Sequence, residues 1–188
     1  MTKHGKRSRN WNNEARVYNY LGDPITQDFV ATRIMDVGAA SVLDIGCFKG
    51  ALWGRLLQKG FEGRYTGFEI AGKPLAAACS LYGERSDRHE FIHADAILST
   101  LPAAEFIAIG GFFFYLDDNQ TTAYLTKVLQ ECSPRWILAN DVHRCKNRIY
   151  LSGCNDGLEH GEFVMPVETH NSKRKYIFWD ERSQKAVH

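Results

Sequence analysis

Three acidic residues stand at the ends of three successive apolar segments of the chain. Asp44 lies within segment 41–46, Glu69 closes segment 64–70, and Asp95 follows segment 89–93. Carboxylates accept hydrogen bonds from hydroxyl and amino groups and attract positively charged groups. Because the carboxyl ends of parallel strands meet at one edge of a sheet, we expect the three acids to line one ligand site.

The first acid opens a glycine-containing loop, DIGCFKG, at residues 44–50. A dinucleotide loop has the pattern G-x-G-x-x-G, which Gly46 begins but Phe48 and Ala51 break. The G-x-x-x-x-G-K-[ST] pattern of a phosphate loop does not occur here. Gly46 and Gly50 allow a ligand to approach the backbone closely. The loop therefore argues against NAD and against a P-loop nucleotide.

This loop resembles the first motif of the class I S-adenosylmethionine (SAM)-dependent methyltransferases, [D/E]-x-G-x-G-x-G, with Phe48 as the departure at the middle glycine. The resemblance extends from about residue 41 to residue 141. It implies that Asp44 meets the amino group of SAM, Glu69 the ribose hydroxyls and Asp95 the adenine amino group. The other residues that it implies for SAM binding are Gly46, Cys47, Gly50, Ile70, Ala96, Gly110 and Tyr18.

Each acid also has a purely structural interpretation. Asp44 could be a buried cap in a glycine turn, Glu69 a surface residue at a strand end, and Asp95 the cap of a short following helix. The order of the three acids along the chain favours the cofactor site over these alternatives.

The methyl acceptor is predicted to lie beside the fifth strand segment, 135–140. Asp141 and His143 follow it, and His143 is the candidate general base because its ordinary pKa lies near 6.5. A solvent-facing or capping histidine is the alternative. The basic run 144–148 could hold an acidic or phosphorylated acceptor, or be a solvated helix face. After the fourth strand segment, GGFF replaces the [N/D/S]-P-P-[Y/F/W] motif of the enzymes that methylate base or glutamine nitrogens.

The elements that position these residues alternate in type. Strand segments at 41–46, 64–70, 89–93, 105–110 and 135–140 are separated by helix-like segments, which predicts right-handed crossovers and a parallel sheet. Two further runs, 162–168 and 175–180, read as a hairpin that adds an antiparallel edge strand. The expected fold is a doubly wound, mostly parallel seven-stranded α/β sheet with helices on both faces.

The length and composition predict a single domain at residues 11–188, preceded by a flexible basic tail at 1–10. The N-terminal helices of this domain, at 11–38, are expected to close over the cofactor. Of 23 basic and 22 acidic residues, four basic and no acidic ones lie in 1–9. The rest of the chain is therefore slightly acidic, near −3, which makes nucleic acid an unlikely partner. The five cysteines form no C-x-x-C pair, so we expect neither a disulfide framework nor a metal site. The apolar runs are shorter than the ~20 residues of a membrane span, so we expect a cytoplasmic protein.

Together these features predict a SAM-dependent methyltransferase. It would transfer a methyl group to oxygen or nitrogen of a small or medium-sized metabolite, such as a sugar, a natural product or a carrier-tethered acceptor. Two alternatives stay open: a methyltransferase that acts on a protein or RNA, and a non-catalytic binding module of the same fold. The sequence does not distinguish oligomeric states.

Overall fold

A computed structural model of the chain describes residues 24–110, 112–113, 116–142, 165–169, 172–180 and 185–186. Its helices are α2 (Pro24–Asp36), α3 (Ala51–Gln58), α4 (Gly72–Tyr82) and α5 (Asp118–Cys132). Its first five strands are β1 (Ser41–Ile45), β2 (Arg64–Glu69), β3 (His89–His93), β4 (Phe106–Gly110) and β5 (Trp136–Val142). The predicted strand segments are thus confirmed to within two residues, and α2 lies in the segment 11–38 where N-terminal helices are expected.

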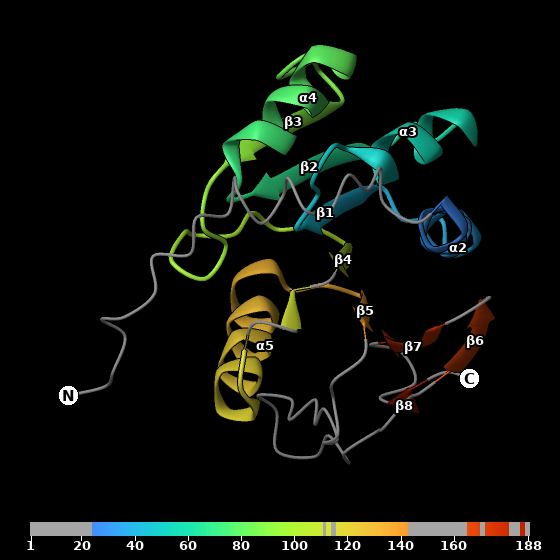
Figure 1. The fold of residues 1–188 in the computed structure, drawn as a ribbon, viewed down its shortest axis with the longest axis vertical. Helices are drawn as coiled ribbons and strands as arrows, with labels where there is room; N and C mark the ends of the chain where they lie inside the picture. Colours follow the sequence, from blue (N-terminus) through green and yellow to red (C-terminus); the bar gives the residue numbers. More distant parts are fainter. Residues whose placement is uncertain are drawn as a thin grey trace.

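The five strands form a parallel sheet in the order β3-β2-β1-β4-β5 (Figure 1). The chain first adds strands on one side of β1 and then crosses to the other side at β4. This reversal leaves a crevice beyond the carboxyl ends of β1 and β4, where open α/β sheets bind their ligands. The prediction of a parallel α/β fold is confirmed.

Two hydrophobic clusters fill the two faces of the sheet, because successive strand residues point to opposite sides. Val42 packs with residues of α2, α3 and α4, whereas its neighbour Leu43 packs with residues of α5. Figure 1 shows α5 on the opposite side of the strands from α3 and α4. Both faces are therefore covered by helices, as predicted, and the apolar runs of the strands are buried on both sides.

Local sequence explains where the helices begin and end. Asp117 caps α5 in a capping box: its side chain accepts from the backbone N–H of Gln120, and the Gln120 side chain accepts from the N–H of Asp117. Helix α3 is followed by Gly60, whose φ of 75° belongs to the left-handed region. Both are local signals, set by residues next to the helix ends.

Three more strands are described by their backbone alone: β6 (Met165–Thr169), β7 (Ser172–Asp180) and β8 (Lys185–Ala186). In the backbone pairing, β7 runs antiparallel to β5, β6 and β8. The sheet of seven strands with an antiparallel edge strand stays a prediction. The predicted helix at 11–22 and the basic tail lie outside the described residues.

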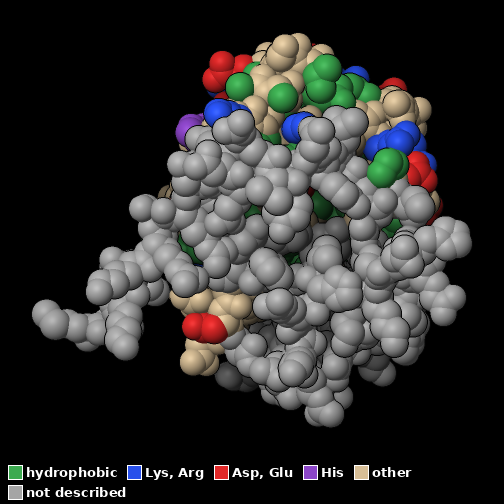
Figure 2. Space-filling model, in the orientation of Figure 1, with side chains coloured by type: hydrophobic (Ala, Val, Ile, Leu, Met, Phe, Trp, Pro, Cys, Tyr) green, Lys and Arg blue, Asp and Glu red, His purple; other side chains and the backbone are tan. Residues whose placement is uncertain are grey.

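Exposed apolar side chains include Leu57 on α3 and Leu81 on α4. Figure 2 shows hydrophobic side chains at the surface in the region of these helices, interspersed with lysine and arginine. None of the helices in the described part of the chain is long and apolar enough to cross a membrane.

Candidate functional site

The loop after β1 turns back toward the end of β2. The backbone N–H groups of Gly46 and Cys47 both donate to the carbonyl oxygen of Phe68, at 2.9 and 3.0 Å. Gly46 has a φ of 81° and Gly50 a φ of 72°, and the Gly50 N–H donates to the Cys47 carbonyl. Both glycines adopt the left-handed backbone that other residues rarely reach, so the loop is compact and fixed at both ends.

Gly46 and Gly110 approach each other closely at the carboxyl edge of the sheet. A Cβ atom on Gly46 would lie 2.9 Å from the carbonyl oxygen of Gly110, the last residue of β4. Gly50 has a different role, because a Cβ there would meet the rings of Phe91 and Tyr82. The lack of a side chain on Gly46 therefore lets the β1 loop pack against the end of β4, whereas its lack on Gly50 lets α3 pack against its neighbours.

Phe48 occupies the place of the middle glycine and keeps a glycine-like backbone, with a φ of 52°. Its N–H donates to the Glu69 Oε2 atom at 2.9 Å. The Lys49 ammonium lies 5.5 Å from the centre of the Phe48 ring. The substitution thus changes the side chain at this position and preserves the path of the loop.

Glu69, at the end of β2, is only 8% exposed, so its interpretation as a surface residue is wrong. Its Oε1 atom accepts from the Ala71 N–H at 2.7 Å, while Oε2 holds Phe48. Burial raises the pKa of this carboxyl, and the backbone N–H groups of Ala71, Phe48 and Ile70 oppose the rise. A carboxylate has about four lone-pair sites, so these three N–H groups leave one for a ligand hydroxyl.

Asp44 is 5% exposed, and its Oδ2 atom accepts a hydrogen bond of 2.6 Å from the Tyr65 hydroxyl. Burial raises the pKa of Asp44 to about 7; Tyr65 opposes the rise and the Glu69 charge adds to it. Among the described residues no cationic side chain pairs with Asp44, and a buried carboxyl in such surroundings favours a ligand that brings positive charge. Sequence reasoning missed Tyr65. In the register of β1 against β2, Asp44 pairs with Gly67. Tyr65 stands two residues before Gly67, so it lies on the same face of the sheet as Asp44.

Asp95 follows β3 in a turn, so the short helix of the alternative interpretation does not form. Its Oδ1 atom accepts from the Ile97 N–H at 2.9 Å, and its carbonyl accepts from the N–H groups of Leu98 and Ser99. Ala96 is buried, whereas Ile97 is exposed. The Ala94 N–H donates to the Glu69 carbonyl at 3.1 Å, which places this turn beside the end of β2.

A pocket opens between α2, the β1 loop and the end of β4. Its lining residues include Gln27, Asp44, Gly46, Phe48, Ala51 and Gly110. The structure thus brings Asp44, Gly46, Cys47 and Gly110 together, as the sequence predicted, and adds Gln27 and Val30 of α2, which it did not.

The other predicted site residues have separate places. Ile70 directs its carbonyl to the His93 ring at 3.0 Å. The backbone of Asp141 pairs with Lys175 of β7. His143 and Tyr18 lie outside the described residues.

Cys47 is buried, and its thiol has a pKa well above the usual value because of burial and then the charges of Asp44 and Glu69. A thiolate nucleophile is therefore disfavoured at this position. Within the described ranges, no group of three His, Cys, Asp or Glu side chains is arranged to bind a metal.

No family model and no curated protein sequence matches the chain. Solved structures do match it. Magnesium protoporphyrin IX methyltransferase (ChlM) from Synechocystis PCC 6803, with SAM bound, is 16% identical, covers 73% of this chain and 73% of its own, and has a TM-score of 0.58. The plantazolicin methyltransferase BpumL, in complex with SAH, is 19% identical, with coverages of 72% and 55% and a TM-score of 0.54.

The methyltransferase domain of bacterial CtHen1 is also similar, at 19% identity, 64% and 68% coverage and a TM-score of 0.54. At these identities the similarity concerns the fold, and this chain spans between about half and three quarters of the three matched chains. The parallel sheet with its reversal at β1 and β4 agrees with this similarity. The chain has the fold of the class I SAM-dependent methyltransferases.

Proposed function

We propose that the protein is a SAM-dependent methyltransferase that methylates oxygen or nitrogen of a small or medium-sized metabolite. The observation that carries the proposal is the loop between β1 and α3. Its two left-handed glycines flank Phe48, whose N–H is fixed by Glu69, and the buried Asp44 lies behind it. This arrangement combines an open backbone cradle with two acids at adjacent strand ends.

The residues present fit this cofactor. Gly46 lets the β1 loop lie closer to the Gly110 carbonyl oxygen than a Cβ atom would allow, and both glycines line the pocket. Asp44, whose pKa is about 7 in the free protein, offers a negative charge once a positively charged amino group lies beside it, because such a group lowers the pKa of the carboxyl. Glu69 keeps capacity to accept from a ribose hydroxyl. Asp95, with Ile70 and Ala96 beside it, would contact the adenine. When bound, SAM supplies a methyl group on a positively charged sulfur.

The protein contributes mainly alignment to such a transfer, because the acceptor atom must stand in line with the methyl group at about 3 Å. We assign His143 the removal of the acceptor proton and Asp141 the support of that site at the end of β5. We also propose that Tyr18 and the N-terminal helices at 11–38 cover the bound cofactor in the pocket. The lining of the pocket by Gln27 and Val30 of α2 supports this cover.

The names of similar structures support an acceptor of small or medium size. They include methyltransferases named for magnesium protoporphyrin IX, for plantazolicin and, in one putative case from Galdieria sulphuraria, for sarcosine and dimethylglycine. We propose a sugar, natural product or carrier-tethered metabolite, held through an acidic or phosphate group by Arg144, Lys146 and Arg148. We further propose that the protein is cytoplasmic and consists of a flexible basic tail at 1–10 and a single domain at 11–188. In that domain, β6 and β7 complete a seven-stranded sheet with an antiparallel strand.

Calorimetry with SAM and with S-adenosylhomocysteine (SAH) tests the proposal. We expect both to bind the wild-type protein, and Glu69→Gln to weaken SAH binding by about tenfold through the loss of charged hydrogen bonds. The matched control is Glu90→Gln on β3, whose carboxylate forms an exposed ion pair with Arg85. Absence of binding by the wild type at millimolar SAM and SAH would overturn the proposed function.

A second measurement separates an enzyme from a binding module. Purified protein with methyl-labelled SAM and a panel of hydroxylated and amino metabolites is expected to yield a labelled product. The same assay with protein and RNA acceptors tests the alternative acceptors, and deletion of residues 1–9 tests their docking. SAM binding without transfer to any acceptor in these panels would contradict the catalytic part of the proposal.

A further inference from the structure

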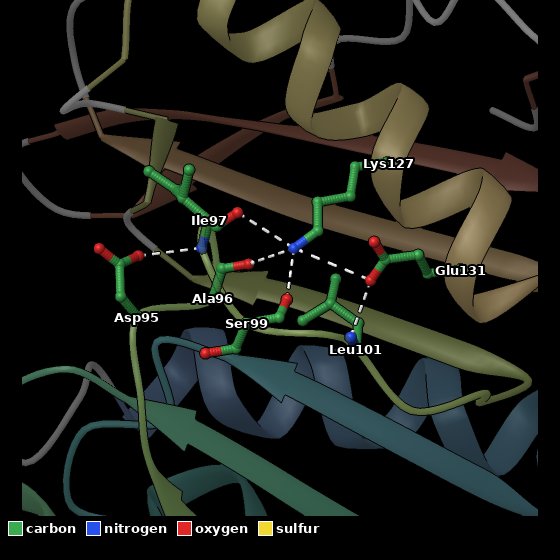
Figure 3. A network of polar contacts seen from close by, with 7 residues as sticks. All are labelled: Asp95, Ala96, Ile97, Ser99, Leu101, Lys127 and Glu131. Carbon is green, nitrogen blue, oxygen red and sulfur yellow. Dashed lines mark hydrogen bonds and ion pairs between the residues drawn. The ribbon is translucent and has the colours of Figure 1, made fainter. Parts of the chain in front are cut away.

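Lys127 is a partly buried lysine on α5 whose ammonium group points at the turn after β3. Its side chain is 22% exposed. The Nζ atom donates to the carbonyl oxygens of Ala96 at 3.2 Å and Ile97 at 3.1 Å, and also to that of Ser99 (Figure 3). An ammonium group has three donors and no acceptor, so these three carbonyls match its full hydrogen-bonding capacity.

Glu131, one helical turn further along α5, completes the contact. Its Oε2 atom lies 3.8 Å from Lys127 Nζ and accepts from the Leu101 N–H at 2.8 Å. Figure 3 shows Lys127 and Glu131 reaching from the same helix to this segment of the chain. The backbone from Ala96 to Leu101 is thus attached to α5 at both ends. We call Lys127 and Glu131 the α5 clamp.

The turn needs such a clamp because regular structure does not hold it. Residues 94–105 connect β3 to β4 without a helix, and Leu98 within them is 83% exposed. The internal hydrogen bonds close the turn on Asp95, but they do not fix it relative to the sheet. Its other anchors are the Ala94 N–H at the Glu69 carbonyl and the buried Ala96. The α5 clamp therefore adds to these anchors and attaches the segment directly after Asp95 to α5.

We propose that Lys127 is a positioning residue for purine recognition, which holds the turn so that Asp95 meets the adenine amino group. This inference rests on the proposed function, because Asp95 is assigned to adenine there. Lys127 contacts backbone carbonyls and takes no part in the transfer itself. Without its charge, three carbonyls lose their donors and Glu131 loses its partner, and the turn becomes free to shift away from the purine.

The test compares SAH with S-inosylhomocysteine, in which a carbonyl oxygen replaces the adenine amino group. A carboxylate accepts from the amino group and repels the oxygen, and the proton that the 6-oxo purine carries on N1 lies at a different place on the ring edge, so the wild type is expected to prefer SAH. Lys127→Met is expected to reduce this preference by about tenfold, mainly through weaker SAH binding. Lys127→Arg, which keeps the charge and its donors, should restore part of it. The control is Lys59→Met, whose ammonium pairs with Asp28 at 3.0 Å, away from the turn.

Amide hydrogen exchange in the free protein tests the clamp without any ligand. The N–H groups of Leu98, Ser99 and Leu101 are expected to exchange about tenfold faster in Lys127→Met and to keep their wild-type rates in Lys59→Met. Glu131→Gln, which retains an acceptor for Leu101, serves as a milder variant with a smaller change in the same direction.

The outcomes distinguish the two proposals. SAH binding by the wild type, with unchanged purine preference in Lys127→Met, overturns the positioning role and leaves the proposed function intact. An equal loss of affinity for both ligands also overturns it, because a purely structural role weakens both. If the wild type binds neither ligand, the proposed function fails and the purine role fails with it. Faster exchange with reduced purine preference supports the inference.

Discussion

Phe48 shows how one residue can depart from a motif while its backbone does not. Its φ of 52° lies in the left-handed region, which costs a non-glycine residue about 1–2 kcal/mol. The hydrogen bond from its N–H to Glu69 and the neighbouring turn of Gly46 hold that conformation. The sequence identified the position as unusual, but the backbone angle follows from contacts with β2 that are distant in sequence.

Substitution of Phe48 tests this strain. We expect Phe48→Gly to change the free energy of unfolding by less than about 1 kcal/mol, because relief of strain offsets the lost ring contacts and the greater freedom of the unfolded chain. Phe48→Val should destabilise by more than about 1 kcal/mol, since a β-branched residue tolerates this backbone least. Urea unfolding of both variants measures the difference. A valine variant as stable as the glycine variant would contradict the strain.

The titration of Asp44 predicts a pH dependence of stability. Its pKa is about 7 in the folded protein against an ordinary value of 3.8, so the folded chain holds a proton that the unfolded chain releases between these values. The contribution of this group to stability is therefore full below about pH 4 and declines as the pH rises to 7, by up to about 4 kcal/mol.

Asp44→Asn removes this titration and retains an acceptor for the Tyr65 hydroxyl. We expect its free energy of unfolding to vary less between pH 5 and 8 than that of the wild type, as measured by urea unfolding at each pH. Asp36→Asn, at a side chain 55% exposed, should keep the wild-type slope. The same slope in Asp44→Asn as in the wild type would refute the assignment.

At the scale of elements, strand segments and helix ends were predictable because their signals are local. Apolar runs predict β1 to β5, and the Asp117-x-x-Gln120 spacing is typical of the capping box that begins α5. The hydrogen bond between Tyr65 and Asp44 was not predictable from the sequence, because it depends on the register of β1 against β2. The contacts of the turn after Asp95 could not be predicted either, because its carbonyls accept from Lys127, about thirty residues later.

The close approach of the β1 loop to the end of β4 can be measured with a matched pair of glycines. Gly46 and Gly60 have φ values of 81° and 75°, but a Cβ atom meets Gly110 at 2.9 Å only in the first case, while Gly60 has open space. Both alanine variants incur backbone strain, of about 1 kcal/mol. We expect Gly46→Ala to cost at least about 1 kcal/mol more in urea unfolding and also to weaken SAH binding. If Gly46→Ala and Gly60→Ala lower the free energy of unfolding equally, the end of β4 can shift away from the added Cβ atom without cost, and the close approach is not a constraint.

At the scale of the whole molecule, the site depends on segments spread along most of the described chain. The pocket is lined from Gln27 of α2 to Leu138 of β5, across both sides of the point where strand order reverses. The sequence predicted this convergence from the order of the strands, but it could not predict which residues of α2 take part. A ligand at this site therefore binds only the folded domain and stabilises it as a unit.

That linkage predicts the thermal behaviour of the protein. SAH at a hundred times its dissociation constant is expected to add about 2.7 kcal/mol to stability, which corresponds to a rise in Tm of about 5–10 °C for a domain of this size. Differential scanning calorimetry measures the shift. Glu69→Gln at the same SAH concentration should show a smaller shift, because its weaker binding reduces the ratio of ligand to dissociation constant. Glu90→Gln should shift as the wild type does. A full shift in Glu69→Gln would mean that SAH binds away from the β1–β2 edge, and the glycine loop would then lose its place as the cofactor site.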